Sequence, residues 1–168
     1  EEIISEVKLK TLPERLYPHI TGRFAWILED KKIYRLYPDG KKELYLKLKE
    51  GIKDFKPSPD CQYLAVFTEK QTKLYSADDK TLVYNVKIVP DSTFVFLGGD
   101  PPSFLIGKNM SNFESLTWPE TLYLVRKGQP RLIMTNLSGT VVADHSGRAF
   151  YSIKPKNYIE KRDTETGK

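Results

Sequence analysis

Short runs of alternating hydrophobic and polar residues follow one another along almost the whole chain. One example is T-G-R-F-A-W-I-L-E-D-K-K-I-Y-R-L-Y-P-D-G-K-K-E-L-Y-L-K-L, from Thr21 to Leu48. Alternation over about four to eight residues predicts a β-strand with one buried face. The Gly, Pro and Asp residues between the runs predict turns. We therefore expect an all-β chain built from antiparallel hairpins.

The stretch D-F-K-P-S-P-D-C-Q-Y-L-A-V-F, from Asp54 to Phe67, shows how two such runs are joined. Proline fixes a backbone angle and aspartate bonds its own backbone, so Pro57 to Asp60 predict a sharp turn between two strands. The stretch from Thr140 to Ile153 repeats this arrangement, with D-H-S-G as the turn. The same strand–turn–strand unit is therefore expected more than once.

The chain contains an internal repeat of about four units. The middle strands of these units centre on residues spaced by 41, 48 and 37 positions, which are Ile33, Leu74, Leu122 and Ile159. A period of about 40 residues with about four strands per unit is typical of β-propeller blades. We predict a single domain over residues 1–168, with blades at about 13–50, 51–89, 90–138 and 139–168 and an N-terminal strand at 2–10. The alternative is an unrelated run of hairpins in a sandwich or an open meander.

The predicted strands leave two kinds of propeller open. The last unit stops at Thr166-Gly167-Lys168, before its fourth strand, and one extra strand at Glu2 to Lys10 precedes the first unit. The chain is then either a small four-bladed ring, latched by that extra strand, or half of a larger propeller. A half would expose a strand edge and would need a partner, such as a second copy of the chain.

Two motifs resemble a known group of repeats. Asp54 to Phe67 resembles the F-S-P-D-G-(K/R)-Y-L-A core of TolB-like and WD40-like propeller repeats, and I-E-K-R-D-T-E-T-G-K resembles their D-x-x-T-G-K turn. The resemblance covers nearly the whole chain and implies the propeller architecture, but no activity. The Trp-Asp and Gly-His pairs of strict WD40 repeats are missing, so their His–Asp–Trp network is not expected here.

The composition indicates a folded chain outside the membrane. Of its 168 residues, 39% are hydrophobic and 29% charged, which is typical of a globular protein. No apolar run approaches the roughly 18 residues that a membrane-spanning helix needs. The single cysteine, Cys61, and the acidic first residues favour a cytoplasmic location over a secreted one.

The charge suggests a basic surface. The net charge is +5, with 20 Lys and 7 Arg, and bidentate recognition of nucleic acid depends on Arg more than on Lys. Sorting the predicted turns by propeller face gives one basic and one acidic face. The candidate contacts on the basic face are Lys31, Lys32, Lys70, Lys73, Lys108, Lys154 and Lys156. We expect this face to attract an acidic protein partner, although charged turns also serve simply to stay solvated.

The insertion from Asn109 to Glu120 is a second candidate contact region. It carries Phe113 and Trp118, and aromatic side chains on a long loop are frequent binding residues. Alternatively, the loop folds back over the edge of a blade.

The sequence contains no recognisable catalytic or metal-binding pattern. Its two histidines, His19 and His145, and its one cysteine lack the spacing of a zinc site, and D-H-S-G is typical of a tight turn. We therefore predict no metal, no cofactor and no enzyme activity.

The predicted function is a non-catalytic propeller scaffold for protein–protein interaction. Two alternatives are the gating propeller of a larger enzyme, such as a prolyl-oligopeptidase-type serine peptidase, and an RNA- or ribosome-associated propeller of the translation-factor type. The last predicts binding that weakens steeply with salt.

Overall fold

The structure is a computed structural model that describes residues 7, 9, 11–91, 93–109, 120–137, 141–144, 146–154, 158–164 and 166–168. Within these ranges every regular element is a β-strand. The strands are β1 (Arg15–Pro18), β2 (Ala25–Glu29), β3 (Lys32–Leu36), β4 (Lys42–Lys47), β5 (Asp54–Pro57), β6 (Tyr63–Phe67), β7 (Thr72–Ser76), β8 (Leu82–Val86), β9 (Phe94–Phe96), β10 (Phe104–Asn109), β11 (Glu120–Arg126), β12 (Gln129–Leu137), β13 (Val141–Ala143), β14 (Ala149–Lys154) and β15 (Tyr158–Asp163).

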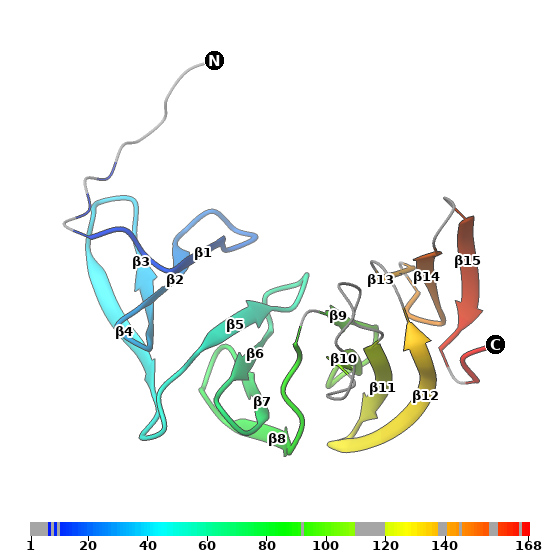
Figure 1. The fold of residues 1–168 in the computed structure, drawn as a ribbon. Coiled ribbons are helices and arrows are strands. Elements are labelled where there is room, and N and C mark those ends of the chain that lie inside the picture. The colour runs from blue at the N-terminus through cyan, green and yellow to red at the C-terminus, as the bar shows by residue number, and fades with distance from the viewer. Residues whose placement is uncertain are drawn as a thin grey trace. The chain divides into compact units, whose positions relative to one another are not determined.

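The strands form four separate antiparallel sheets, each a simple meander (Figure 1). The first sheet has the order β1-β2-β3-β4, the second β5-β6-β7-β8 and the third β12-β11-β10-β9, while the fourth has the three strands β13-β14-β15. Every strand pairs with its neighbour in the sequence, as expected when short turns join antiparallel strands. The predicted all-β fold of four-stranded antiparallel units is confirmed.

The chain divides into two compact units, which are described separately. The first comprises Glu1–Glu69 and Lys73–Leu82, and the second comprises Lys70–Thr72 and Val83–Lys168. The single domain and the blade boundaries expected from the sequence stay predictions.

The core of the first unit lies between two sheets. Trp26 and Leu28 of β2 and Ile33 of β3 are buried in one cluster with Phe55 of β5 and Val66 of β6. Trp26 and Leu28 alternate with Ile27, so they lie on one face of the first sheet, which is the face that contacts the second. We call this the packed face of the first sheet.

The core of the second unit has the same construction. Leu105 of β10 and Leu122 and Leu124 of β11 pack against Val141 of β13 and Phe150 of β14. Val141 and Phe150 are 5% and 0% exposed. In both units, therefore, one sheet stacks face to face on the next sheet along the chain.

The turn between the first two strands has the same geometry in three of the sheets. The backbone N–H of its first residue donates to the carbonyl of a residue at or just before the start of the next strand, in the pairs His19–Phe24 (3.0 Å), Ser58–Tyr63 (2.9 Å) and Asp144–Ala149 (2.9 Å). A positive φ follows in each turn, at Gly22 (68°), Cys61 (58°) and Gly147 (67°). The predicted strand–turn–strand arrangement around Pro57 to Asp60 is confirmed. Cys61 occupies the turn position at which the first and fourth sheets have glycine.

Several expectations concern residues outside the described ranges. The proposed N-terminal strand at 2–10 is one, since only Val7 and Leu9 of it are described and neither is part of a strand. Residues 110–119 of the insertion are another, so the positions of Phe113 and Trp118 lie outside the structure's description. In the part of the chain that is described, no helix is long and apolar enough to cross a membrane.

Candidate interaction surface

The side of the first sheet opposite its packed face is rich in apolar side chains. Strand pairing places Leu16, Ile27, Tyr34 and Leu44 in one row across β1, β2, β3 and β4. Leu16 is 52% exposed and Leu44 is 47% exposed, whereas Ile27 is buried. We call this the outward face of the first sheet. Its register follows from the period of two along each strand, which separates these residues from Trp26 and Leu28.

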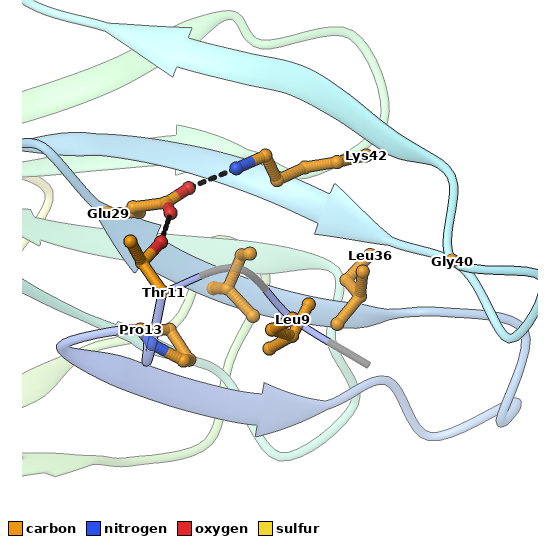
Figure 2. Close-up of a pocket in the computed structure, with 8 residues that line it drawn as sticks. Leu9, Thr11, Pro13, Glu29, Leu36, Gly40 and Lys42 are labelled. Carbon is orange, nitrogen blue, oxygen red and sulfur yellow. Dashed lines mark hydrogen bonds and ion pairs between the residues drawn. The ribbon is translucent and has the colours of Figure 1, made fainter. Parts of the chain in front are cut away.

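The chain before β1 covers part of the outward face and leaves a cavity beneath it (Figure 2). The cavity has a volume of about 530 Å³ and is lined by Leu9, Thr11, Pro13, Ile27, Glu29, Leu36, Gly40 and Lys42. Its four apolar lining residues are Leu9 and Pro13 of the covering segment and Ile27 and Leu36 of the sheet. A cavity between a sheet face and the segment over it shows that the segment fills the face incompletely.

A hydrogen-bonded ion pair forms the polar end of the cavity. Glu29 accepts hydrogen bonds from the ammonium group of Lys42 and from the hydroxyl of Thr11 (Figure 2). These two bonds lower the pKa of Glu29, and the bond to Glu29 raises the pKa of Lys42. Both groups are therefore charged near neutral pH and paired with each other. The row of Leu16, Ile27, Tyr34 and Leu44 is then the part of this face that is open to contact with another molecule.

The packed face contains an aromatic enclosure for one cation. The guanidinium carbon of Arg35 lies 5.0 Å from the ring centres of both Phe24 and Trp26 and 4.9 Å from that of Tyr45. Arg35 Nη2 donates to the carbonyl of Ala77 at 3.0 Å. Three rings and one carbonyl thus hold this arginine between the first sheet and the chain after β7, which makes it a structural group.

Tyr45 reinforces the same junction. Its hydroxyl donates to the carbonyls of Ser76 and Ala77, at 3.0 and 3.1 Å. Burial raises the pKa of Tyr45 to about 12. The neutral phenol is therefore the form that the folded chain holds.

The structure distributes the candidate lysines over both units. Lys31 and Lys32 lie where β2 turns into β3, and Lys73 in β7 forms an ion pair with Glu50 at 2.6 Å. Lys108 forms an ion pair with Asp91 at 2.8 Å. Two of the predicted contacts are thus already neutralised by acidic neighbours.

The other three candidate lysines lie outside these ion pairs' strands or at a strand end. Lys70 lies between β6 and β7, Lys154 ends β14, and Lys156 lies outside the described residues. The role of the lysines in binding stays a prediction.

The D-H-S-G turn is built as a turn and lies beside a polar cavity. Ser146 Oγ donates to both carboxylate oxygens of Asp144 at 3.0 Å, and the backbone N–H of Ala149 donates to Asp144 Oδ1 at 3.3 Å. The cavity measures about 470 Å³ and is lined by Asp144, Ser146, Arg148, Ala149, Lys161 and Asp163. Among the side chains that the structure describes, no three His, Cys, Asp or Glu residues gather to hold a metal ion.

Solved structures resemble this chain, but sequences do not. No known protein family and no curated protein matches the sequence. The dihydro-heme d1 dehydrogenase NirN, in complex with DHE, matches 90% of the chain with a TM-score of 0.63 at 14% identity. KlAtg21, in complex with the coiled-coil of AgAtg16, matches 95% with a TM-score of 0.64 at 9% identity. A eukaryotic initiation factor matches 93% with a TM-score of 0.57 at 9% identity.

The fold is that of a β-propeller. The predicted propeller architecture is confirmed, whereas no particular sequence family of propellers is established. The chain spans 35% of NirN, 54% of KlAtg21 and 44% of the initiation factor. At these identities the likeness concerns the fold alone.

The prediction that this chain is not an enzyme is contradicted. It rested on the lack of a catalytic pattern in the sequence, yet the same fold is found in NirN, which is a dehydrogenase. The physical reason is that a bound cofactor carries the difficult chemistry, while the fold needs to supply only binding and orientation. A missing triad or metal motif is therefore no argument against catalysis in a propeller.

Sequence reasoning missed the outward face of the first sheet. The signal was present, since Leu16 stands 39 positions before Phe55, and Ile27 stands 39 before Val66. Aligning the repeats strand by strand shows that the outward face of the first sheet repeats a buried face of the second sheet. It does not show whether that face is covered, because coverage depends on what lies beyond the sheet.

Proposed function

We propose that this chain is a protein-interaction module and that the outward face of the first sheet is its docking surface. The observation that carries the proposal is the exposure of Leu16 and Leu44, 52% and 47%, in a row whose other members are Ile27 and Tyr34. Ile27 is buried and Tyr34 is half-buried between these two exposed leucines, so the whole row is apolar or aromatic. Exposed apolar surface of this kind marks interaction sites.

The cavity adds a place for an anchoring side chain. Interfaces draw most of their binding energy from a few apolar or aromatic groups that fill well-packed pockets. A volume of about 530 Å³ next to Ile27 and Leu36 has room for such a group. The Glu29–Lys42 pair beside it supplies a polar rim. Protein association by a propeller also has a parallel in KlAtg21, whose structure contains the coiled-coil of AgAtg16.

We also propose that an acidic partner contacts individual lysines of either unit and the aromatic residues of the insertion. These residues are Lys31, Lys32, Lys70, Lys73, Lys108, Lys154 and Lys156, with Phe113 and Trp118. The net charge of +5 supports it, because a basic surface steers acidic partners toward itself. Lys31 is the member best placed for contact, since it is exposed at the tip of the β2–β3 turn.

The docking surface is tested by photo-crosslinking in living cells of the source. The photoreactive residue p-benzoylphenylalanine replaces Leu44 on the outward face, or Leu132 in β12 as a control of similar exposure, 53%. We expect irradiation to yield a discrete crosslinked species from position 44, whose composition is then identified by mass spectrometry. Position 132 should yield none.

The comparison between the two positions decides the proposal. A species that forms at both positions reports non-specific contact and overturns the assignment of the docking surface. The absence of any species at position 44 overturns the proposal as well, because a docked partner would lie within reach of the probe.

A further inference from the structure

We propose that the partner on the outward face of the first sheet is the fourth sheet of a second copy of this chain. This inference rests on the proposed function and names its partner. In the contact, Val142 and Tyr151 of one copy face the row formed by Leu16, Ile27, Tyr34 and Leu44 of the other. The argument comes from the way in which sheets already stack inside each unit.

The outward face of the first sheet is the counterpart of a face that is buried in the second sheet. Phe55 and Val66 pack against the first sheet in the core cluster, and they are 0% exposed. Leu16 and Ile27 hold the same positions 39 residues earlier. Phe55 pairs with Val66 as Leu16 pairs with Ile27.

The middle strands extend the same correspondence. Tyr75 and Ala77 belong to the buried cluster on the second sheet, and Tyr34 and Leu36 hold the same positions 41 residues earlier. The outward face of the first sheet thus has the side-chain pattern of a surface that receives another sheet.

The fourth sheet presents the complementary face. Its Val141 and Phe150 are buried against the third sheet, so Val142 and Tyr151, which alternate with them and pair with one another, lie on the opposite side. Val142 is 55% exposed, and Ile159 of β15 is 73% exposed. We call this the outward face of the fourth sheet.

This second outward face repeats the packed face of the first sheet. Val142 and Tyr151 stand 125 positions after Tyr17 and Trp26, and both of those residues contact the second sheet in the buried cluster. The chain therefore carries a face with the receiving pattern on its first sheet and a face with the inserting pattern on its fourth. A second copy offers both, which makes the contact heterologous, with different surfaces meeting.

The charged residues follow the same correspondence. Lys161 pairs with Tyr151 as Arg35 pairs with Trp26, and it stands 126 positions after Arg35. Arg35 donates to the carbonyl of Ala77 in the neighbouring part of its own unit, and Leu36 is the counterpart of Ala77. Lys161 is therefore expected to donate to the Leu36 carbonyl of the second copy.

The segment before β1 competes for this face. Leu9, Thr11 and Pro13 line the cavity over Ile27 and Leu36, and the Thr11 hydroxyl bonds Glu29. A second copy must displace this segment to stack fully. Self-association is therefore expected to be weaker than sheet stacking within the unit, and to depend on concentration.

The experiment measures the solution mass of the purified full chain by light scattering, from about 1 to about 200 μM. Three variants are compared with the unaltered chain: Leu44→Asp on the first sheet, Val142→Asp on the fourth, and Leu132→Asp as the control. We expect the mass of the unaltered chain to rise with concentration. Leu44→Asp and Val142→Asp should each raise the dissociation constant at least about a hundredfold, because each buries an unpaired charge in an apolar contact. Leu132→Asp should change it little.

Mixing the two interface variants tests which surfaces meet. The Val142→Asp chain keeps its receiving face, and the Leu44→Asp chain keeps its inserting face, so their mixture can form one intact contact between the two variants. We expect the mixture to associate more strongly than either variant alone. If Leu44→Asp abolishes association while Val142→Asp leaves it unchanged, two first sheets meet each other and the proposal is overturned.

The remaining outcomes separate this inference from the proposed function. A chain that stays monomeric at every concentration overturns the second copy as partner. If it does so while the probe at position 44 captures a different protein, the docking surface stands and only its occupant is wrong. If the chain is monomeric and the probe captures nothing, both proposals fail.

Discussion

Arg35 stabilises the first unit through contacts that could not be predicted from its position in the sequence. In the alternating pattern of β3 a charged residue is expected to point to solvent, yet Phe24, Trp26 and Tyr45 surround its guanidinium group. Phe24 directly precedes β2, Trp26 lies in β2 and Tyr45 lies in β4, and the pairing of β2, β3 and β4 brings the three rings around Arg35. A planar, weakly hydrated cation suits such an enclosure better than an ammonium group does.

Replacing Arg35 by Lys is therefore expected to destabilise the protein. The change removes the flat contact with the rings and the directed bond to Ala77, and we expect a loss of about 1–2 kcal/mol in the free energy of unfolding. The measurement is urea-induced unfolding followed by tryptophan fluorescence, to which Trp26 and Trp118 both contribute. Arg23→Lys, at an exposed position, is the matched control and should stay within about 0.5 kcal/mol. Equal effects of the two changes would show that the enclosure contributes nothing specific.

Tyr45 gives the stability a defined dependence on alkaline pH. Its folded-state pKa of about 12 lies above the usual value of 10.0 because of burial. The stabilisation is complete below pH 10 and is lost as pH rises toward 12, since the unfolded chain ionises first. We expect a loss of up to about 3 kcal/mol over this range.

The comparison for Tyr45 is the Tyr45→Phe variant. It gives up the bonds to Ser76 and Ala77 and should be less stable by about 1 kcal/mol at neutral pH. Its unfolding free energy should also fall less steeply above pH 10, as measured by urea unfolding at several pH values. Parallel pH profiles for the two proteins would rule out Tyr45 as the titrating group.

At the scale of elements, the turns between first and second strands explain why the repeat was visible in the sequence. Each needs one residue with positive φ and one side chain that bonds the local backbone, and only a few residue types satisfy these conditions. Gly22 and Gly147 meet the first condition, as does Cys61 with some strain. The same kinds of turn residue therefore recur at equivalent places, which made the repeat recognisable. The strands between the turns could be predicted from the alternation of hydrophobic and polar residues.

The two glycines occupy equivalent turns in very different surroundings. A Cβ atom on Gly147 would lie 2.4 Å from the backbone nitrogen of Gly98, whereas a Cβ on Gly22 would meet nothing within 4 Å. Gly22→Ala should therefore cost only the backbone strain of a positive φ, about 1 kcal/mol. Gly147→Ala should cost about 3 kcal/mol or more, because a backbone atom must move as well.

Thermal unfolding of the two glycine variants provides the measurement. We expect the midpoint temperature to fall several times further for Gly147→Ala than for Gly22→Ala. Similar losses at both positions would mean that the D-H-S-G turn is not packed against Gly98 as the structure describes.

What the sequence could not predict is which sheet faces have no neighbour. Leu16 and Phe55 occupy the same position in the first and second sheets, but one is 52% exposed and the other is 0% exposed. Their surroundings differ because Phe55 packs against the first sheet, whereas among the described residues Leu9, Thr11 and Pro13 cover the outward face of the first sheet incompletely. Predicting a binding site from charged turns directed attention to the lysines and away from this apolar row.

At the scale of the whole molecule, the net charge of +5 makes self-association and RNA binding respond differently to salt. Two copies of a basic chain repel each other, and salt screens that repulsion without weakening apolar contact. Binding to RNA would instead depend on phosphate contacts and would release counterions. Its affinity would then fall steeply with salt.

We therefore expect opposite responses to salt. Between about 50 and about 500 mM NaCl, self-association should stay constant or strengthen by up to about threefold, because the contact is apolar and the repulsion is screened. The affinity for a generic single-stranded RNA, measured by fluorescence anisotropy at the same salt concentrations, should be weak and should fall at least about tenfold. Self-association that collapses over this range would point to the lysines around Lys31 rather than to Leu44 as the contact, because only charge–charge attraction is screened in that way.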